Sequence, residues 1–444
     1  MSELRAGVLR RPGVVGASLR EHLSEVYDRW LAGLLPERPG LALAAVGGLG
    51  RREPAPHSDL DLVLLHDGSV NGLADVADAI WYPVWDARIG LDHSVRTPAE
   101  AVAVARTDLK ALLGLLDLRP VAGDPALVAT VRGAVLDTWR ATAAKRLPEL
   151  QAIARDRWAV AGEAAYLLEP NLKESRGGLR DAQSLRALAT AQLVDYPVRV
   201  REAYAVLLDV RGELHRLTGR AEDVLRLQEQ DGVAAALGCL DSDAEQGRDV
   251  LLRRVNEAAR TVAHHLELAE RRVEALNRRP ARRRWFGSSQ TVPDRVGLAP
   301  DVVAQDGEVV LARDADPAAD PGLLLRVARA AAEHDRPIAP FTLDRLAAEA
   351  APLPVPWPAA ARDDFVALLG TGPPAVAVLE ALDQAGLLVR LVPEWDAVRC
   401  RAQHNPVHRF TVDRHLLETA AAAATSERDV DRRDLLLVGA LLHD

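Results

Sequence analysis

The first part of the chain alternates between short apolar runs and longer stretches in which apolar residues recur at helical spacing. The expected elements are a helix at 19–35, strands at 41–46, 60–65 and 89–95, and a helix at 70–85. Pro54 and Pro56 prevent a helix from forming between the first two strands. The pattern therefore predicts a small α/β unit over residues 1–97.

From residue 98 to residue 280, the apolar residues follow helical spacing almost throughout. Helices are expected at 99–118, 126–147, 179–193, 198–217 and 250–276. Residues 281–322 are rich in Arg, Pro, Gly and Asp, which predicts a linker, with an apolar run at 309–311 that suits a hairpin. Helical spacing returns over 323–444. The predicted fold class is α+β, with a helical domain at 98–280 and a second helical region after the linker.

The composition is that of a globular chain with an acidic surface. Its 444 residues predict two or three domains, and its formal charge of −9 argues against a dedicated nucleic-acid binder. Cys239 and Cys400 lie far apart, which favours a reducing compartment over a disulfide framework. The N-terminus lacks a signal peptide's apolar run, and the apolar stretch 435–442 is too short to span a bilayer. We therefore expect a cytoplasmic protein that binds neither nucleic acid nor a membrane.

Residues 47–61 carry the candidate chemistry. Gly47, Gly48 and Gly50 follow the first predicted strand, and glycine lets backbone N–H groups approach a triphosphate closely. Asp59 and Asp61 are two apart on the next strand, so their carboxylates leave the same face. Carboxylates and phosphate oxygens are the ligands that magnesium prefers. The combination predicts in-line attack on an α-phosphate, whereas either half alone would be read as a turn or a solvated strand edge.

This stretch resembles the signature of the DNA polymerase β-type nucleotidyltransferase superfamily. Its longer form, Gly-Gly-x-Gly-Arg-x-Glu followed by Pro-x-Ser-Asp-x-Asp, resembles the bacterial PII uridylyltransferase/uridylyl-removing enzymes, although Leu49 and Arg52 depart from the family pattern. The resemblance implies a polymerase β-like domain with a mixed sheet, followed by a helical domain and a partial all-α HD domain. It also implies transfer of UMP, or AMP, from UTP or ATP to a tyrosine of the PII signalling protein, with Mg²⁺ as cofactor.

The resemblance also implies roles for individual residues. Asp59 and Asp61 would bind the metal, and Asp92 would be the third catalytic carboxylate, although the family's acidic residue falls at Gly90. Two positions along a strand preserve the face, so Asp92 remains the candidate. The predicted nucleotide-binding residues are Gly47, Gly48, Gly50, Arg51 and Ser58.

Two further stretches, 168–181 and 213–223, resemble segments of the same family's helical domain. Lys173, Arg176 and Arg180 lie in the first of them. They are interpreted either as contacts for triphosphate charge or, equally, as structural ion pairs and helix caps.

The C-terminal residues resemble the opening of an HD phosphohydrolase domain, the part that removes the nucleotide in this family. His415, His443 and Asp444 would supply three ligands of a divalent metal. The later ligands of such a site, and the family's ACT domains, do not follow, so we expect a truncated chain with an incomplete hydrolase site. The alternatives are an enzyme like the adenylyltransferase of glutamine synthetase, a non-catalytic PII-binding fragment, and a metal-dependent phosphohydrolase.

From this incomplete ligand set we predict that the chain, incubated with nucleotidylated PII and divalent metal, removes no nucleotide. Intact-protein mass spectrometry of PII over time measures this. Metal-dependent removal by the purified chain would contradict it.

Overall fold

The computed structural model describes residues 1–242, 245–278, 295–403, 410–426 and 430–443. The chain divides into two compact units, Met1–Arg278 and Arg279–Asp444. The first contains the residues of the glycine and carboxylate motif.

A four-stranded mixed sheet forms the centre of the first unit, in the order β3-β2-β1-β4. Its strands are β1 (Leu41–Ala45), β2 (Leu60–His66), β3 (Leu91–Arg96) and β4 (Arg119–Gly123). β1 is antiparallel to both β2 and β4, whereas β2 and β3 are parallel. The short helix α3 (Gly47–Gly50) follows β1, as expected for the glycine turn.

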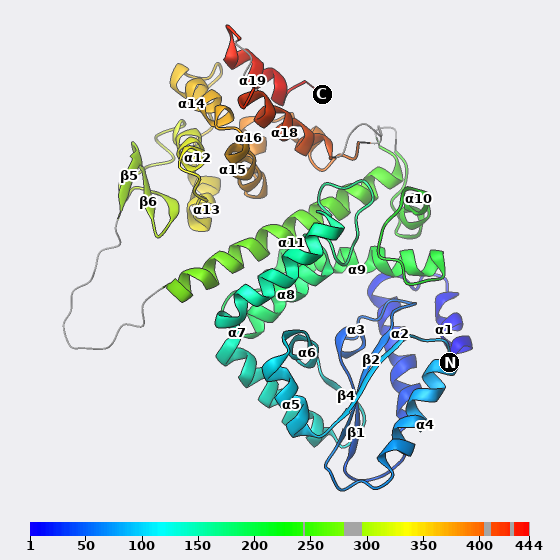
Figure 1. Cartoon of the computed structure of the whole chain (residues 1–444). Coiled ribbons are helices and arrows are strands. Elements are labelled where there is room, and N and C mark those ends of the chain that lie inside the picture. Colours follow the sequence, from blue (N-terminus) through cyan, green and yellow to red (C-terminus); the bar gives the residue numbers. More distant parts are fainter. Residues whose placement is uncertain (243–244, 279–294, 404–409, 427–429, 444) are drawn as a thin grey trace, which may run out of the picture. The chain divides into compact units, whose positions relative to one another are not determined.

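The two faces of this sheet are covered by different helices (Figure 1). Leu41 and Leu43 of β1 and Leu62 and Leu64 of β2 belong to one buried cluster with residues of α1, α2 and α4. These helices span Ser2–Leu9, Gly16–Ala32 and Leu73–Asp86. Because side chains alternate between faces along a strand, Asp61 points to the opposite face. On that side lie α5 (Pro98–Thr107), α6 (Leu109–Leu115) and α7 (Pro125–Ala161).

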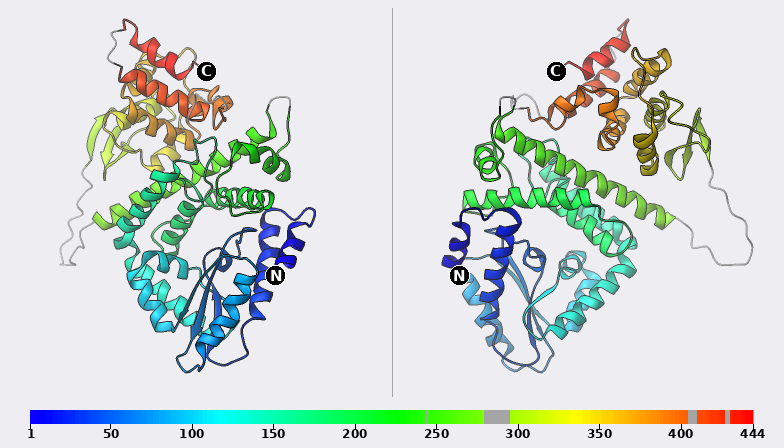
Figure 2. Two further views of the ribbon diagram at one scale, coloured as in Figure 1. Left: turned by 45° about the vertical axis from the view of Figure 1, so that its right-hand side comes forward. Right: turned by 180° about the vertical axis from the view of Figure 1, so that it is seen from behind.

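The remainder of the first unit is helical. The helices are α8 (Leu179–Thr190), α9 (Val198–Thr218), α10 (Leu227–Ala236) and α11 (Gly247–Arg278). The long helix α11 packs against α8, α9 and α10 (Figure 2). The loop between α7 and α8 is held by Asp181, a fully buried carboxylate that accepts hydrogen bonds from Arg157 at 2.8 Å and from the Gly177 N–H at 2.8 Å.

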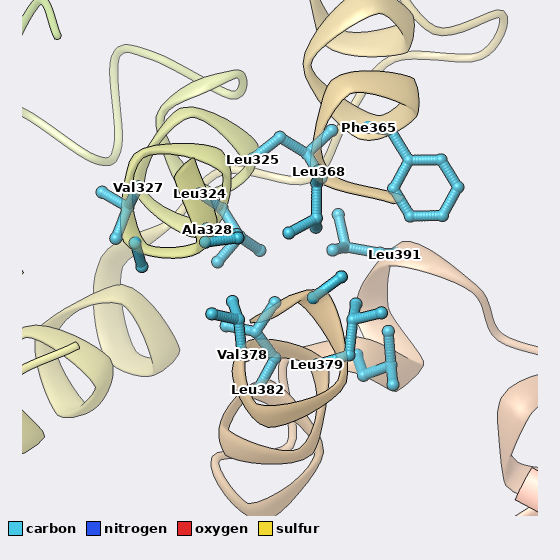
Figure 3. Packing of buried hydrophobic residues seen from close by; sticks show 14 of the residues in the cluster. Leu324, Leu325, Val327, Ala328, Phe365, Leu368, Val378, Leu379, Leu382 and Leu391 are labelled. Carbon is cyan, nitrogen blue, oxygen red and sulfur yellow. The ribbon is translucent and has the colours of Figure 1, made fainter. Parts of the chain in front are cut away.

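The second unit combines a small antiparallel sheet with a helical core. β5 (Val296–Ala299), β6 (Val302–Gln305) and β7 (Glu308–Leu311) pair in sequence order. The helices that follow are α12 (Leu323–Glu333), α13 (Pro340–Glu349), α14 (Ala359–Gly370), α15 (Pro373–Gln384), α16 (Leu388–Leu391), α17 (Trp395–Val398), α18 (Val412–Ala424) and α19 (Arg433–Leu441). Leu325, Leu368 and Leu382, from α12, α14 and α15, converge in its core (Figure 3).

The architecture agrees with the predicted α+β class with a mixed sheet, and two boundaries differ from those expected. The sheet extends past residue 97, because β4 pairs with β1 although residues 46–118 separate them in sequence. β4 was not predicted, because its sequence contains Pro120 and Gly123 and lacks an alternation of apolar and polar residues. The expected linker 281–322 contains the β5–β7 sheet, whereas residues 281–294 lie outside the described residues.

Among the described residues, no single helix has the length and apolar composition needed to cross a membrane. The bent pair of α14 and α15 meets these two criteria only when the two helices are taken together.

Replacing Trp139 with Phe tests how α8 is held against α7. Trp139 is fully buried, and its Nε1 donates to the Ala187 carbonyl oxygen at 2.7 Å. Loss of this bond and of ring volume should lower the free energy of unfolding by about 2–3 kcal/mol. Urea unfolding followed by far-ultraviolet circular dichroism measures the change. Trp85→Phe is the control, because Trp85 is 43% exposed, and an equal loss in both variants would contradict the prediction.

Candidate active site

The parallel strands β2 and β3 place two predicted carboxylates beside each other. In their register Leu60 pairs with Leu91, and Asp61 pairs with Asp92. Paired residues of neighbouring strands point to the same face, so both carboxylates lie on the side of α5, α6 and α7. Asp59 immediately precedes β2. The three carboxylates singled out in the sequence therefore gather at the start of these two strands.

Two glycines make room for these carboxylates. Gly47 has a φ of +56°, and a Cβ at this position would lie 2.4 Å from Oδ2 of Asp61. Gly90 lies against the other carboxylate, since a Cβ there would be 1.8 Å from Oδ1 of Asp59. A side chain at position 90 would therefore displace Asp59 as it stands here. The acidic residue that pairs with Asp61 is Asp92 of β3, two positions after Gly90.

The electrostatics of Asp61 reflect this crowding. Burial raises the pKa of Asp61, and the neighbouring carboxylates of Asp92 and Asp59 raise it as well. The guanidinium groups of Arg180 and Arg51 lower it, but the net pKa stays above the ordinary value. A divalent cation relieves such crowding of like charges, and carboxylate oxygens are suitable ligands for Mg²⁺.

Within the described part of the chain, no group of three or more His, Cys, Asp or Glu side chains forms a ready metal site. Magnesium in proteins usually keeps water or substrate phosphate oxygens among its ligands and needs only one or two carboxylates. The residues present at the start of β2 and β3 fit that kind of site.

A cavity of about 1220 Å³ opens beside Asp61 and Asp92. Ligand cavities commonly measure roughly 300–1,000 Å³, so this space exceeds the need of one small molecule. The glycine turn contributes Gly47 and Arg51 to its wall, and α6, α7 and α8 contribute most of the remainder. Gly48, Gly50, Ser58 and Asp59 do not line it.

Several basic side chains line the same cavity, and they differ in what they already contact. Arg157 pairs with Asp181 at 2.8 Å, and Arg186 pairs with Asp117 at 2.7 Å. Arg180 is 50% exposed, and its ion pair with Glu174 is long at 3.7 Å. Lys110 is exposed, and nothing among the described residues is seen to pair with it. Arg180 and Lys110 are therefore available to meet an anionic ligand.

Of these two cations, only Arg180 was a candidate from the sequence. Arg180 belongs to the stretch 168–181 that carried the family resemblance, and it was one of three candidates there. The other two are engaged elsewhere, because Lys173 lies 3.6 Å from Asp223 and Arg176 pairs with Glu267 at 3.1 Å. Lys110 was missed, since no motif surrounds it and only the packing of α6 against α5 and α7 brings it to the cavity.

Arg51 was predicted to bind nucleotide, and the structure shows its guanidinium already paired. Nε donates to Glu53 at 2.7 Å, and Nη1 donates to Asp117 at 2.7 Å. Arg186 also donates to Asp117, and the Tyr204 hydroxyl donates to Glu53 at 2.7 Å. These contacts connect the glycine turn to α8 and α9. The charge of Arg51 is thus balanced within the protein.

Ser58, also predicted to bind nucleotide, contacts the helical part of the unit. Its Oγ accepts a hydrogen bond from Nη1 of Arg211 at 3.3 Å. Gly50 is packed tightly as well, because a Cβ there would lie 2.4 Å from the Asp117 carbonyl oxygen. Gly48 is less confined, with 3.7 Å from such a Cβ to the nearest atom, the Glu53 carbonyl oxygen.

Comparison with known proteins identifies the chain's relatives. The sequence model of the GlnD PII-uridylyltransferase family matches residues 149–195 and 193–269. The bifunctional uridylyltransferase/uridylyl-removing enzyme of Streptomyces coelicolor is 53% identical over 97% of this chain and 52% of that relative. The chain belongs to the PII-uridylyltransferase family.

Other members of the family show the same relationship. The enzymes of the same name from Mycobacterium tuberculosis H37Rv and Corynebacterium glutamicum are 46% and 39% identical. The matches cover 100% and 93% of this chain, and 55% and 58% of those relatives. The chain therefore spans about half the length of the curated family members that it matches.

Family membership directs attention to the second predicted metal site, in the other unit. His415 lies on α18 and His443 follows α19, and their Nε2 atoms are 3.3 Å apart. Two imidazoles at this distance are close enough to turn toward a shared cation. Asp444, the third predicted ligand, lies outside the described residues, so the completeness of this site stays a prediction.

Gly47→Ala should weaken binding of a nucleoside triphosphate with Mg²⁺ by about tenfold or more, because the added Cβ displaces Asp61 and the positive φ disfavours alanine. Gly48→Ala is the matched control, since its Cβ would make an ordinary contact. Isothermal titration calorimetry with UTP and with ATP measures the affinities, and the melting temperatures show whether both variants fold. Equal losses in the two variants would contradict the steric argument.

Proposed function

We propose that this protein transfers a nucleoside monophosphate, UMP or AMP, from its triphosphate to a tyrosine of the PII signalling protein, and releases pyrophosphate. The observation that carries the proposal is the pairing of Asp61 with Asp92 beside the glycine turn, at the wall of a large cavity. The relatives are named uridylyltransferases, and the family is that of the PII-uridylyltransferases, which supports PII as the acceptor.

The donor triphosphate is proposed to bind between the glycine turn and α8. The N–H groups of Gly47 and Gly48 begin α3, and the first N–H groups of a helix have no carbonyl acceptor within it. Arg180 and Lys110 supply positive charge to the lining of the same cavity. Mg²⁺, bound by Asp61 and Asp59 with Asp92 adjacent, would neutralise the charge that develops on the phosphate oxygens.

The proposed reaction is an in-line displacement at the α-phosphorus. The tyrosine oxygen forms a bond to this phosphorus while the bond to the bridging oxygen of pyrophosphate breaks. Asp92 is exposed at the start of β3, where it can accept the proton of the incoming hydroxyl. The products are a phosphodiester on the acceptor and free pyrophosphate, so atoms and charge balance without another reactant.

A non-catalytic PII-binding module and an enzyme acting on glutamine synthetase are the competing functions. A module without catalysis would have no need for three carboxylates gathered in one place, which costs electrostatic energy in the free protein. The match of the helical region to the PII-uridylyltransferase family favours PII over glutamine synthetase as the acceptor.

The proposal is tested by incubating the purified chain with PII, Mg²⁺ and either UTP or ATP, and by measuring the mass of intact PII. A gain of one nucleoside monophosphate is expected, and the productive nucleotide identifies the donor. Asp61→Asn should lower the rate roughly a thousandfold, because it removes a metal-binding charge without changing side-chain size.

Asp78→Asn is the matched control, since Asp78 is an exposed carboxylate on α4, away from the cavity. It should leave the rate unchanged. No mass gain with either nucleotide, from a chain shown to be folded, would reject transfer to PII and favour the binding-module alternative.

A further inference from the structure

The loop that leads into β2 is attached to helix α9 through one buried arginine. Nη1 of Arg211 donates to Oγ of Ser58 at 3.3 Å, and Nε donates to Oδ1 of Asp223 at 2.6 Å. Arg211 is buried and so belongs to the interior of the unit. Ser58 precedes Asp59 directly. The arginine therefore links the helical part of the chain to the residue next to a candidate metal ligand.

Asp223 is itself held from several directions. Lys173 Nζ and His215 Nε2 both lie 3.6 Å from its carboxylate. Its carbonyl oxygen accepts a hydrogen bond from the Leu172 N–H at 2.8 Å. Burial by itself would raise the pKa of Asp223, but the neighbouring His215 imidazole and the positive charges of Arg211 and Lys173 hold it below the usual range. Asp223 is thus a fixed negative charge that orients Arg211.

A second contact joins the same two segments. The His57 N–H donates to Nδ1 of His215 at 3.4 Å. His215 lies on α9, one helical turn after Arg211, so successive turns of α9 contact successive residues of the loop. The loop has no regular secondary structure between residues 53 and 59, apart from a turn. Its conformation therefore depends on contacts of this kind.

Ser58 is poorly placed for direct contact with a ligand in the cavity. It does not line the cavity, whereas Asp61, three residues later, does. Its Oγ has two lone pairs and one proton, and arginine can only donate. The hydroxyl therefore serves as the acceptor that anchors the loop to α9.

We propose that Arg211, held by Asp223, is a positioning residue that fixes Ser58 and through it the placement of Asp59 and Asp61. The contacts of Arg211 do not depend on the proposed function, but the effect on nucleotidyl transfer rests on it. It accounts for the stretch 213–223, which resembled the family without an evident role. It also changes the interpretation of Ser58 from a nucleotide ligand to an anchor.

The test is a double-mutant cycle with Ser58→Ala, Arg211→Lys and the double variant. Lysine keeps the charge beside Asp223 but lacks the fork that reaches two acceptors. Hydrogen–deuterium exchange of residues 57–61 should rise about tenfold in each single variant, and no further in the double variant, because both remove the same hydrogen bond.

The transfer rate supplies an independent readout. In each single variant kcat should fall about tenfold while the KM for nucleotide stays within about threefold of wild type, because displaced carboxylates affect the reacting phosphate most. The double variant should match the single variants. A purely structural role would lower the melting temperature without this coupling.

Arg20→Lys is the matched control. Arg20 pairs with Asp209, which also lies on α9, and this pair does not contact the loop. The substitution should leave exchange at 57–61 unchanged, and its combination with Ser58→Ala should behave as Ser58→Ala alone. Two outcomes would overturn the proposal. One is an additive loss of kcat, about a hundredfold, in the Ser58→Ala, Arg211→Lys double variant, and the other is unchanged hydrogen exchange at residues 57–61 in Arg211→Lys.

The outcomes also separate this inference from the proposed function. Coupled exchange in a chain that transfers nothing to PII supports the positioning role and rejects the transfer to PII. Transfer by the wild-type chain together with additive effects rejects the positioning role and supports the transfer.

Discussion

The parallel pairing of β2 with β3 is the constraint on which the candidate site depends. It brings Asp61 and Asp92 into register, and burial and the carboxylates of Asp92 and Asp59 raise the pKa of Asp61. A protein gains no stability from such crowding in the absence of a cation. The sheet tolerates it because the opposite face is packed with leucines from β1 and β2 against α1, α2 and α4, which holds the strands in place.

The helical region supports this arrangement at several points. Arg51 and Glu53 connect the glycine turn to Asp117 and Tyr204, and Arg211 connects the next loop to α9. Asp61 and Asp92 come from β2 and β3, whereas Arg180, one of the cations that line the same cavity, comes from α8. The match to the family model covers residues 149–195 and 193–269, which include α8, α9, α10 and most of α11. Of these helices, α8 lines the cavity, and α9 contacts the loop before β2 through Arg211 and His215.

Much of the first unit could be predicted from the sequence. β1, β2, β3 and the helices α2, α4, α8, α9 and α11 appear close to the expected positions, because their apolar periodicity is strong. β4 was missed, since its contacts with β1 are long-range and its residues have no alternating pattern. The helix expected at 99–118 is divided at Asp108, whose side chain accepts from the Ala111 N–H and begins α6.

The sequence by itself determined the chemical identity of the site: glycines, paired carboxylates and their spacing along one strand. These are local features of one short stretch, which can be recognised from the order of its residues alone, although the structure begins β2 one residue after Asp59. Which cations line the cavity with the carboxylates, and which protein groups the motif residues contact, was decided only by the tertiary structure. Arg51 and Ser58 are predicted to bind nucleotide, and their partners within the protein, Asp117 and Arg211, are 66 and 153 residues away. Contacts at such separation leave no trace in local periodicity, since they arise only when the elements pack.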